Sequence, residues 1–210
     1  MSKLFRMDSP LMRFLTKIAD LMVLNILFCV TSIPLITIGA SWTALYSVTL
    51  KMVRDEESSV SRSYFRSFRQ NFKQATLLWL GVLVVLALLV LDIRVLNGMA
   101  GGTAPGLLRV GVEILALLGI MVLQYLFPSL ARFEASLADT LKNACMMALA
   151  HLPKTALMTA AAVGAVWITL INNTTIAVGL TVWPLIGFAL MAFGNSGILR
   201  KIFDNYVPKA

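Results

Sequence analysis

Side chains suited to catalysis are sparse in this 210-residue sequence. Its one histidine, His151, precedes Leu152 and Pro153. No Ser/His constellation, paired catalytic carboxylates, phosphate-binding glycine loop or HExxH motif accompanies it. The two cysteines, Cys29 and Cys145, lack CxxC or metal-ligand spacing. We therefore expect no enzyme activity, no catalytic residues, no metal site and no bound cofactor.

Charged residues inside apolar segments are a second place where chemistry could reside. Arg109 and Glu113 are four positions apart, the spacing at which side chains meet on a helix. Asp92 and Arg94 lie near the end of the preceding apolar segment, and the four charges sum to zero. Because unpaired charges in a membrane are costly, we interpret the four as an ion-pair group. A polar translocation site is the alternative interpretation.

A basic and aromatic segment, VSRSYFRSFRQNFKQA, covers residues 60–75. Its phenylalanines and arginines recur at helical spacing, which predicts an amphipathic helix running into the next apolar segment. Such a helix either rests on anionic lipid headgroups or docks a partner protein. The candidate docking residues are Phe65, Arg66, Phe68, Arg69 and Phe72.

The elements that position these residues must lie in a membrane. The chain is 59% hydrophobic and only 13% charged, with a mean hydropathy of +0.83, against about 25% charged for soluble domains. Several apolar stretches reach the roughly 20 residues that a membrane-spanning helix needs. We predict one all-α membrane domain, residues 1–210, built as a polytopic helical bundle. The expected spans are about 10–33, 42–54, 76–97, 109–131, 154–171 and 176–193, with amphipathic helices at about 60–75 and 136–150.

Residues 18–53 form an apolar run that is too long for one crossing. As a single helix it would measure roughly 54 Å, against a hydrocarbon core of about 30 Å. Pro34 and Gly39 favour a break, and Ser41 is suited to cap a second helix. We therefore predict a hairpin, whose second helix either spans the membrane or re-enters it. Further along, Ser136 and Asp139 have the spacing of a helix-capping box.

The distribution of basic residues supports the hairpin. With two crossings in residues 18–53, every lysine and arginine except Arg94 and Arg109 lies on one side of the membrane. Lysine and arginine accumulate in cytoplasmic loops, so we expect both termini to be cytoplasmic. This bias also accounts for the net charge of +8, so the charge does not indicate that the protein binds nucleic acid. Membrane lipids are expected partners, and nucleic acid is not.

Three blocks of sequence resemble the YesL-like family of bacterial integral membrane proteins, a domain of unknown function numbered 624. They are GASWTALYSVTLKMVRDEESS (39–59), YFRSFRQNFKQA (64–75) and FPSLARFEASLADTLKNA (127–144). The resemblance implies a multi-pass protein of the bacterial cytoplasmic membrane, often encoded beside carbohydrate ABC uptake systems. No catalytic or ligand residues are established for the family, so none are transferred.

Together these observations favour a non-enzymatic membrane accessory protein that works with the subunits of a carbohydrate ABC transporter. The alternative is a small secondary transporter or channel in its own right. That alternative requires polar residues along a continuous path, and Asn25, Gln124 and Glu113 are too sparse to define one. We interpret Asn25 and Gln124 instead as residues that form hydrogen bonds between helices.

Overall fold

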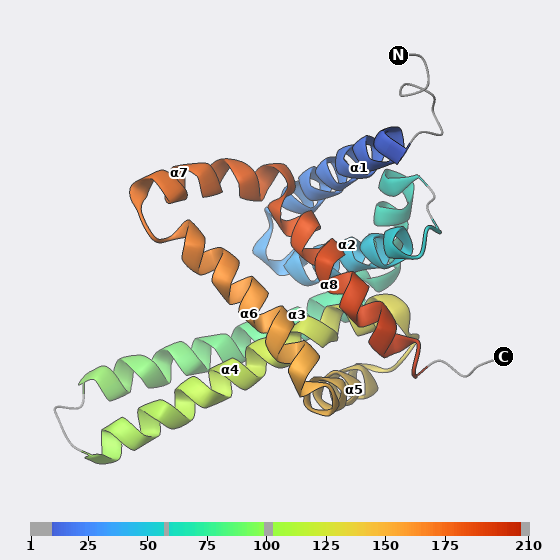
Figure 1. Ribbon diagram of the computed structural model, residues 1–210. Coiled ribbons are helices and arrows are strands. Elements are labelled where there is room, and N and C mark those ends of the chain that lie inside the picture. Colours follow the sequence, from blue (N-terminus) through green and yellow to red (C-terminus); the bar gives the residue numbers. More distant parts are fainter. Residues whose placement is uncertain (1–9, 57–58, 99–102, 207–210) are drawn as a thin grey trace.

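The computed structural model describes residues 10–56, 59–98 and 103–206 (Figure 1). Within these ranges every regular element is a helix, which confirms the predicted all-α fold. In chain order the elements are α1 (Pro10–Thr31), the 3-10 turn η1 (Leu35–Thr37), α2 (Ile38–Val53), α3 (Val60–Gly98), α4 (Thr103–Arg132), α5 (Leu137–Ala150), α6 (Leu152–Thr169), α7 (Asn173–Val182), the π-helical segment η2 (Trp183–Gly187) and α8 (Phe188–Phe203).

Five helical segments are long and apolar enough to cross a membrane. They are Leu11–Thr31, Val60–Gly98, Gly106–Arg132, Leu152–Leu170 and Asn173–Phe203. The helix α2 is not among them, because its 16 residues measure only about 24 Å. A sixth crossing by α2 therefore stays a prediction.

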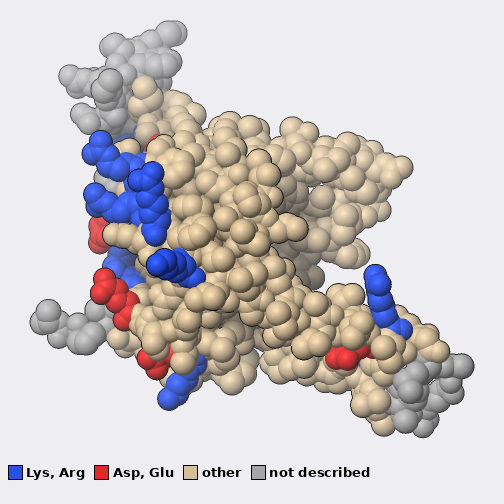
Figure 2. All heavy atoms as spheres, turned by 180° about the vertical axis from the view of Figure 1, so that it is seen from behind, with Lys and Arg blue, Asp and Glu red and all other residues tan. Residues whose placement is uncertain are grey.

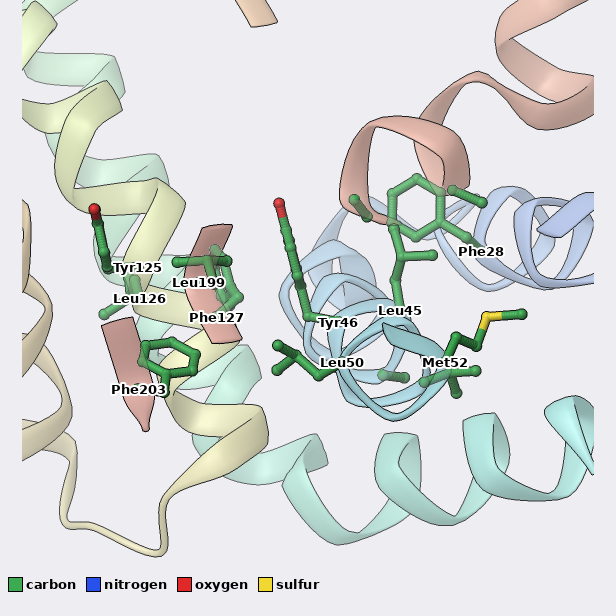
Figure 3. Close-up of a cluster of buried hydrophobic side chains, with 14 of the residues drawn as sticks. Phe28, Leu45, Tyr46, Leu50, Met52, Tyr125, Leu126, Phe127, Leu199 and Phe203 are labelled. Atoms are coloured by element: carbon green, nitrogen blue, oxygen red, sulfur yellow. The ribbon is translucent and has the colours of Figure 1, made fainter. Parts of the chain in front are cut away.

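The helix α2 lies at the centre of the fold, in contact with α1, α3, α4 and α8. Nearly its whole length is buried, and Figure 3 shows its side chains Leu45, Tyr46 and Leu50 in the core. Its buried hydroxyl groups are satisfied locally or by neighbours: Thr43 donates to the carbonyl of Gly39 (2.9 Å), and Thr49 shares a hydrogen bond with Ser196 of α8 (2.8 Å). The shortest of the predicted spans is thus the most buried helix.

The start of α2 differs from the prediction. The helix begins at Ile38, and Ser41 lies in its first turn, where its hydroxyl donates to the carbonyl of Thr37 (3.1 Å). The prediction that Ser41 caps this helix is therefore wrong. The chain reverses earlier, at η1, where the Thr37 hydroxyl group donates to the carbonyl of Thr31 (2.6 Å).

Glycine at position 39 also has a different role from the predicted one. It lies inside α2, where an added Cβ atom would meet the carbonyl oxygen of Ala75 and the Cβ atom of Trp79, both at 2.6 Å. Gly39 therefore permits α2 and α3 to approach closely and does not break the helix.

The predicted amphipathic helix and the span after it form one helix, α3, of 39 residues and about 58 Å. It pairs with α4 to form an arm that extends from the bundle (Figure 1). In α5, the hydroxyl group of Ser136 accepts a hydrogen bond from the Asp139 amide (3.2 Å). Ser136 is therefore confirmed as the cap of this helix, while the Asp139 carboxylate accepts from the Ser136 hydroxyl group (2.6 Å) in place of the backbone bond that completes a capping box.

Ionic contacts tie three helices together at one end of the molecule, which we call the basic end. Lys17 of α1 pairs with Asp55, just beyond α2 (2.8 Å). The hydrogen bond from Lys17 holds the pKa of the Asp55 carboxyl below its ordinary value. The start of α1 therefore lies beside the end of α2, as the predicted hairpin requires.

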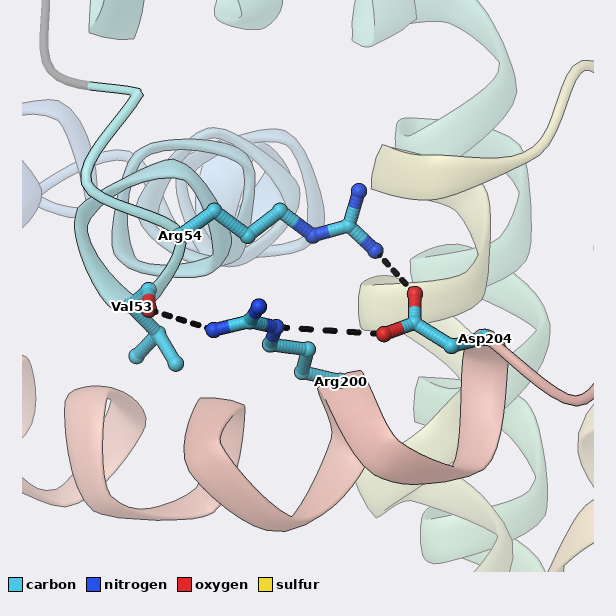
Figure 4. A network of polar contacts seen from close by, with 4 residues as sticks. All are labelled: Val53, Arg54, Arg200 and Asp204. Carbon is cyan, nitrogen blue, oxygen red and sulfur yellow. Dashed lines mark hydrogen bonds and ion pairs between the residues drawn. The ribbon is translucent and has the colours of Figure 1, made fainter.

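The end of α8 joins the same cluster. Figure 4 shows that Arg200 donates to the carbonyl of Val53 at the end of α2 (2.8 Å), while Asp204 pairs with Arg54. Figure 2 shows basic side chains gathered at one end of the molecule and few charged side chains at the other. The fold thus gathers most basic residues at one end, as the sequence predicts from the positions of lysine and arginine.

Candidate functional site

The first half of α3 presents aromatic and basic side chains on its surface. Phe65 and Phe72 are 41% and 37% exposed, and Arg66 and Arg69 are also exposed. We call these four residues the basic-aromatic face. A shallow surface hollow lies along it, lined by Arg62, Phe65, Arg66, Arg69 and Gln70.

Phe68, the fifth predicted docking residue, is directed toward the core. It is half-buried and packs against the core. Its ring stacks on the ring of Tyr64, with centroids 6.3 Å apart, and contacts Phe72 at 5.5 Å. The structure therefore brings four of the five predicted residues onto the surface and assigns Phe68 to packing.

The buried side of this segment follows a different stripe from the phenylalanines. Val60, Tyr64, Ser67 and Ala75 are buried, at spacings that fit one face of a helix. Tyr64 fixes the register of this stripe, because its hydroxyl group forms a hydrogen bond with Thr31 of α1 (2.6 Å). Ser67 and Ala75 are small, so a search for large apolar residues misses these two positions of the stripe.

The chemistry available on the basic-aromatic face is recognition. Within the described residues, neither Arg66 nor Arg69 makes an ion pair. A guanidinium group binds carboxylate or phosphate with two parallel hydrogen bonds, which lysine does not reproduce. Exposed phenylalanine rings supply apolar contact area, and aromatic side chains commonly dominate binding at interfaces.

The predicted ion-pair group is assembled only in part. The Arg109 Nε atom lies 3.0 Å from Glu113 Oε1, and both side chains are more than half exposed. Asp92 and Arg94 are exposed on α3, and no ion pair joins either of them to a residue that the structure describes. Two positions apart, they lie on nearly opposite sides of the helix. The structure thus brings together Arg109 and Glu113 alone.

Two polar residues in the apolar helices form the expected hydrogen bonds between helices. The Asn25 side-chain amide donates to the carbonyls of Trp183 (2.9 Å) and Pro184 (2.6 Å), and its Oδ1 accepts from the Ala189 amide (2.9 Å). The Gln124 amide of α4 donates to the hydroxyl group of Thr159 in α6 (2.6 Å). The interpretation of Asn25 and Gln124 is confirmed.

The histidine first examined for catalysis lies at the connection between two helices. His151 joins α5 to α6, and its Nε2 is 3.3 Å from the hydroxyl group of Tyr206. In the part of the chain that the structure describes, no three His, Cys, Asp or Glu side chains form a group able to hold a metal ion. The absence of enzyme activity stays a prediction.

The architecture defines a class: a membrane-type protein with several apolar helices. The family model described as "Protein of unknown function, DUF624" matches residues 21–93, which cover the second half of α1, all of α2 and most of α3. The chain is also 26% identical, over 159 residues, to uncharacterized protein YesL of Bacillus subtilis (strain 168). The matched region covers 75% of this chain and 74% of YesL. No solved structure matches. The chain is therefore similar to the DUF624 family over residues 21–93 and to YesL over about three quarters of its length.

Proposed function

We propose that this chain is a non-enzymatic accessory protein of the bacterial cytoplasmic membrane that docks a subunit of a carbohydrate ABC-type uptake system. The observation that carries the proposal is the exposure of Phe65 and Phe72 beside Arg66 and Arg69 on one surface of α3. Two exposed rings and two arginines without ion pairs are the side-chain types that anchor protein interfaces.

The rigidity of the face supports this proposal. The opposite side of the same helix is buried, and the hydrogen bond between Tyr64 and Thr31 fixes its orientation. A surface held in its binding conformation loses less entropy when a partner binds. The helix backbone that carries the basic-aromatic face is preorganised in this sense.

The competing proposal, transport by this chain itself, has less support. Arg109 and Glu113 are more than half exposed in the first half of α4, and the side chain of Asn25 forms hydrogen bonds that hold η2. These positions do not provide a line of polar groups for a substrate.

Affinity purification from native membranes tests the proposal. The wild-type chain is expected to recover a subunit of a carbohydrate importer, identified by mass spectrometry. Combining Phe65→Ala with Arg66→Lys removes one anchor and the bidentate geometry of another. We expect it to lower that recovery at least tenfold, as for the loss of interface hot spots.

The matched control is Lys142→Gln on α5, which removes one exposed positive charge outside α3 and should leave recovery unchanged. Phe68→Ala is unsuitable as a docking variant, because it removes core packing. Equal recovery by the Phe65/Arg66 variant and the wild type would rule out docking on this face. Recovery of no importer subunit by the wild type would rule out the proposed partner.

A further inference from the structure

A cavity of about 280 Å³ lies among the apolar helices, away from the basic-aromatic face. Residues from α1, α2, α3, α4, α6, η2 and α8 line it, including three of the four tryptophans of the chain, Trp42, Trp79 and Trp183. No lysine, arginine, aspartate, glutamate or histidine contributes to the lining. The cavity is therefore suited to an uncharged, mainly apolar ligand.

The size of the cavity is sufficient for a substantial apolar group. A cavity of about 150 Å³ lined by apolar side chains stays dry and binds benzene. This one has nearly twice that volume. Water needs two to four polar partners to occupy such a space, and the lining offers few.

The exposed part of the cavity lining belongs to two apolar helices. Ile120 of α4 and Val166 of α6 line the cavity and are themselves exposed, at 42% and 50%. Both lie within helices that are apolar enough to cross a membrane. In Figure 1, α6 leaves α4 as it runs toward α7. A ligand that enters between Ile120 and Val166 therefore comes from the bilayer.

One polar atom of a residue that lines the cavity lacks a partner. The Oε1 atom of Gln124 is covered by protein atoms and has no hydrogen bond in the described structure. The amide nitrogen donates to the Thr159 hydroxyl group, which itself donates to the carbonyl of Thr155 (2.8 Å). This chain of bonds fixes which end of the Gln124 amide is the acceptor. An unsatisfied buried acceptor costs about 1–3 kcal/mol, so a ligand that brings a donor to this wall is favoured.

We propose that the cavity binds the apolar tail of a membrane lipid that carries an uncharged hydroxyl group, with Gln124 Oε1 accepting the hydrogen bond from that hydroxyl. The ligand enters laterally between α4 and α6, and the three tryptophans contact its tail. This inference is independent of the docking proposal, because it involves neither residues 60–75 nor a partner protein.

Tryptophan fluorescence tests this proposal directly. Trp167 is the fourth tryptophan, is 68% exposed and does not line the cavity, so Trp167→Phe leaves only the cavity tryptophans as reporters. The probe is a long-chain fatty alcohol brominated on its tail, added to the purified full chain in an unbrominated maltoside detergent. We expect saturable quenching. The methyl ether of the same alcohol, which cannot donate, should bind roughly three- to tenfold more weakly, the range expected for one hydrogen bond.

Two pairs of measurements distinguish binding of the probe in the cavity from its non-specific partitioning. Ala162→Phe places a ring in the cavity and should abolish saturable quenching, whereas Ala161→Phe, at an exposed neighbouring position outside the lining, should not. Gln124→Met should make the alcohol and its ether bind equally. Thermal unfolding of each variant verifies that it is folded.

Quenching that rises linearly with the probe, or that survives Ala162→Phe, would overturn the binding site. Equal binding of alcohol and ether to the wild-type glutamine would overturn the role of Gln124 and the requirement for a hydroxyl group.

Discussion

At the scale of single residues, Asn25 shows how one polar side chain supports an irregular helix. The segment η2 departs from α-helical geometry and contains Pro184, which has no amide hydrogen to donate. Asn25 crosses from α1 and forms hydrogen bonds with the backbone at Trp183, Pro184 and Ala189. In a membrane, backbone groups without partners are costly, which gives this buried asparagine a structural reason.

Replacing Asn25 with leucine should lower the free energy of unfolding in detergent by about 1–3 kcal/mol. The estimate combines the cost of unsatisfied buried groups with the smaller values, averaging about 0.6 kcal/mol, of single hydrogen bonds between membrane helices. Denaturant-induced unfolding followed by circular dichroism measures this change. Asn97→Leu, at an exposed position on α3, is the control and should stay within about 0.5 kcal/mol of the wild type. A fully stable Asn25→Leu variant would contradict the structural role.

At the scale of elements, the packing of α2 against α3 depends on the absence of a side chain at position 39. The carbonyl oxygen of Ala75 and the Cβ of Trp79 occupy the space that a methyl group would need. Backbone atoms of a packed helix move less easily than the end of a flexible side chain. Adding one methyl group therefore requires the two helices to separate.

Gly39→Ala should destabilise the protein by roughly 1–3 kcal/mol, the usual cost of overpacking. Gly81→Ala is the matched control: Gly81 also lies in a helix, but an added Cβ has no neighbour within 4 Å. It should be neutral or stabilising by up to about 1 kcal/mol, since alanine favours a helix over glycine. Thermal unfolding of the two variants in the same detergent compares them. Equal effects at positions 39 and 81 would argue against the close approach of α2 and α3.

At the scale of the whole molecule, charge is distributed along the direction in which the helices run. The pair formed by Lys17 and Asp55 and the cluster at Arg54, Arg200 and Asp204 bring α1, α2 and α8 together at the basic end. Arg109 and Glu113 lie in the first half of α4, toward the tip of the arm that α3 and α4 form (Figure 1). Because basic loops stay in the cytoplasm, this distribution predicts the orientation of the protein.

Cysteine labelling measures that orientation. In a background that lacks Cys29 and Cys145, Ser59→Cys and Ser136→Cys should react with a membrane-impermeant maleimide only after the cells are permeabilised. Asn97→Cys and Asn173→Cys should react in intact cells. All four positions are exposed, so access to the reagent depends on the side of the membrane. Labelling of Ser59→Cys from outside would contradict the predicted hairpin and the cytoplasmic N-terminus.

The sequence by itself determined the helical class, the apolar segments and the cap of α5. Runs of apolar residues as long as a bilayer is thick have few alternatives to a helix, since every backbone polar group must find a partner within its own segment. The Ser136 cap depends on residues three positions apart, and the hairpin follows from the number of apolar residues and from the charges beside them. All these are local or additive properties of the chain.

Only the tertiary structure decided which faces of these helices are buried and what they contact. Phe68 and Phe65 are three positions apart and alike in type, yet Phe68 packs inward because Tyr64 is fixed by Thr31 of another helix. The need for glycine at position 39 comes from the close approach of α3. The position of Gln124 beside a cavity depends on seven elements from separate parts of the sequence. Contacts of this kind arise when distant segments meet, so hydrophobic periodicity along one segment does not contain them.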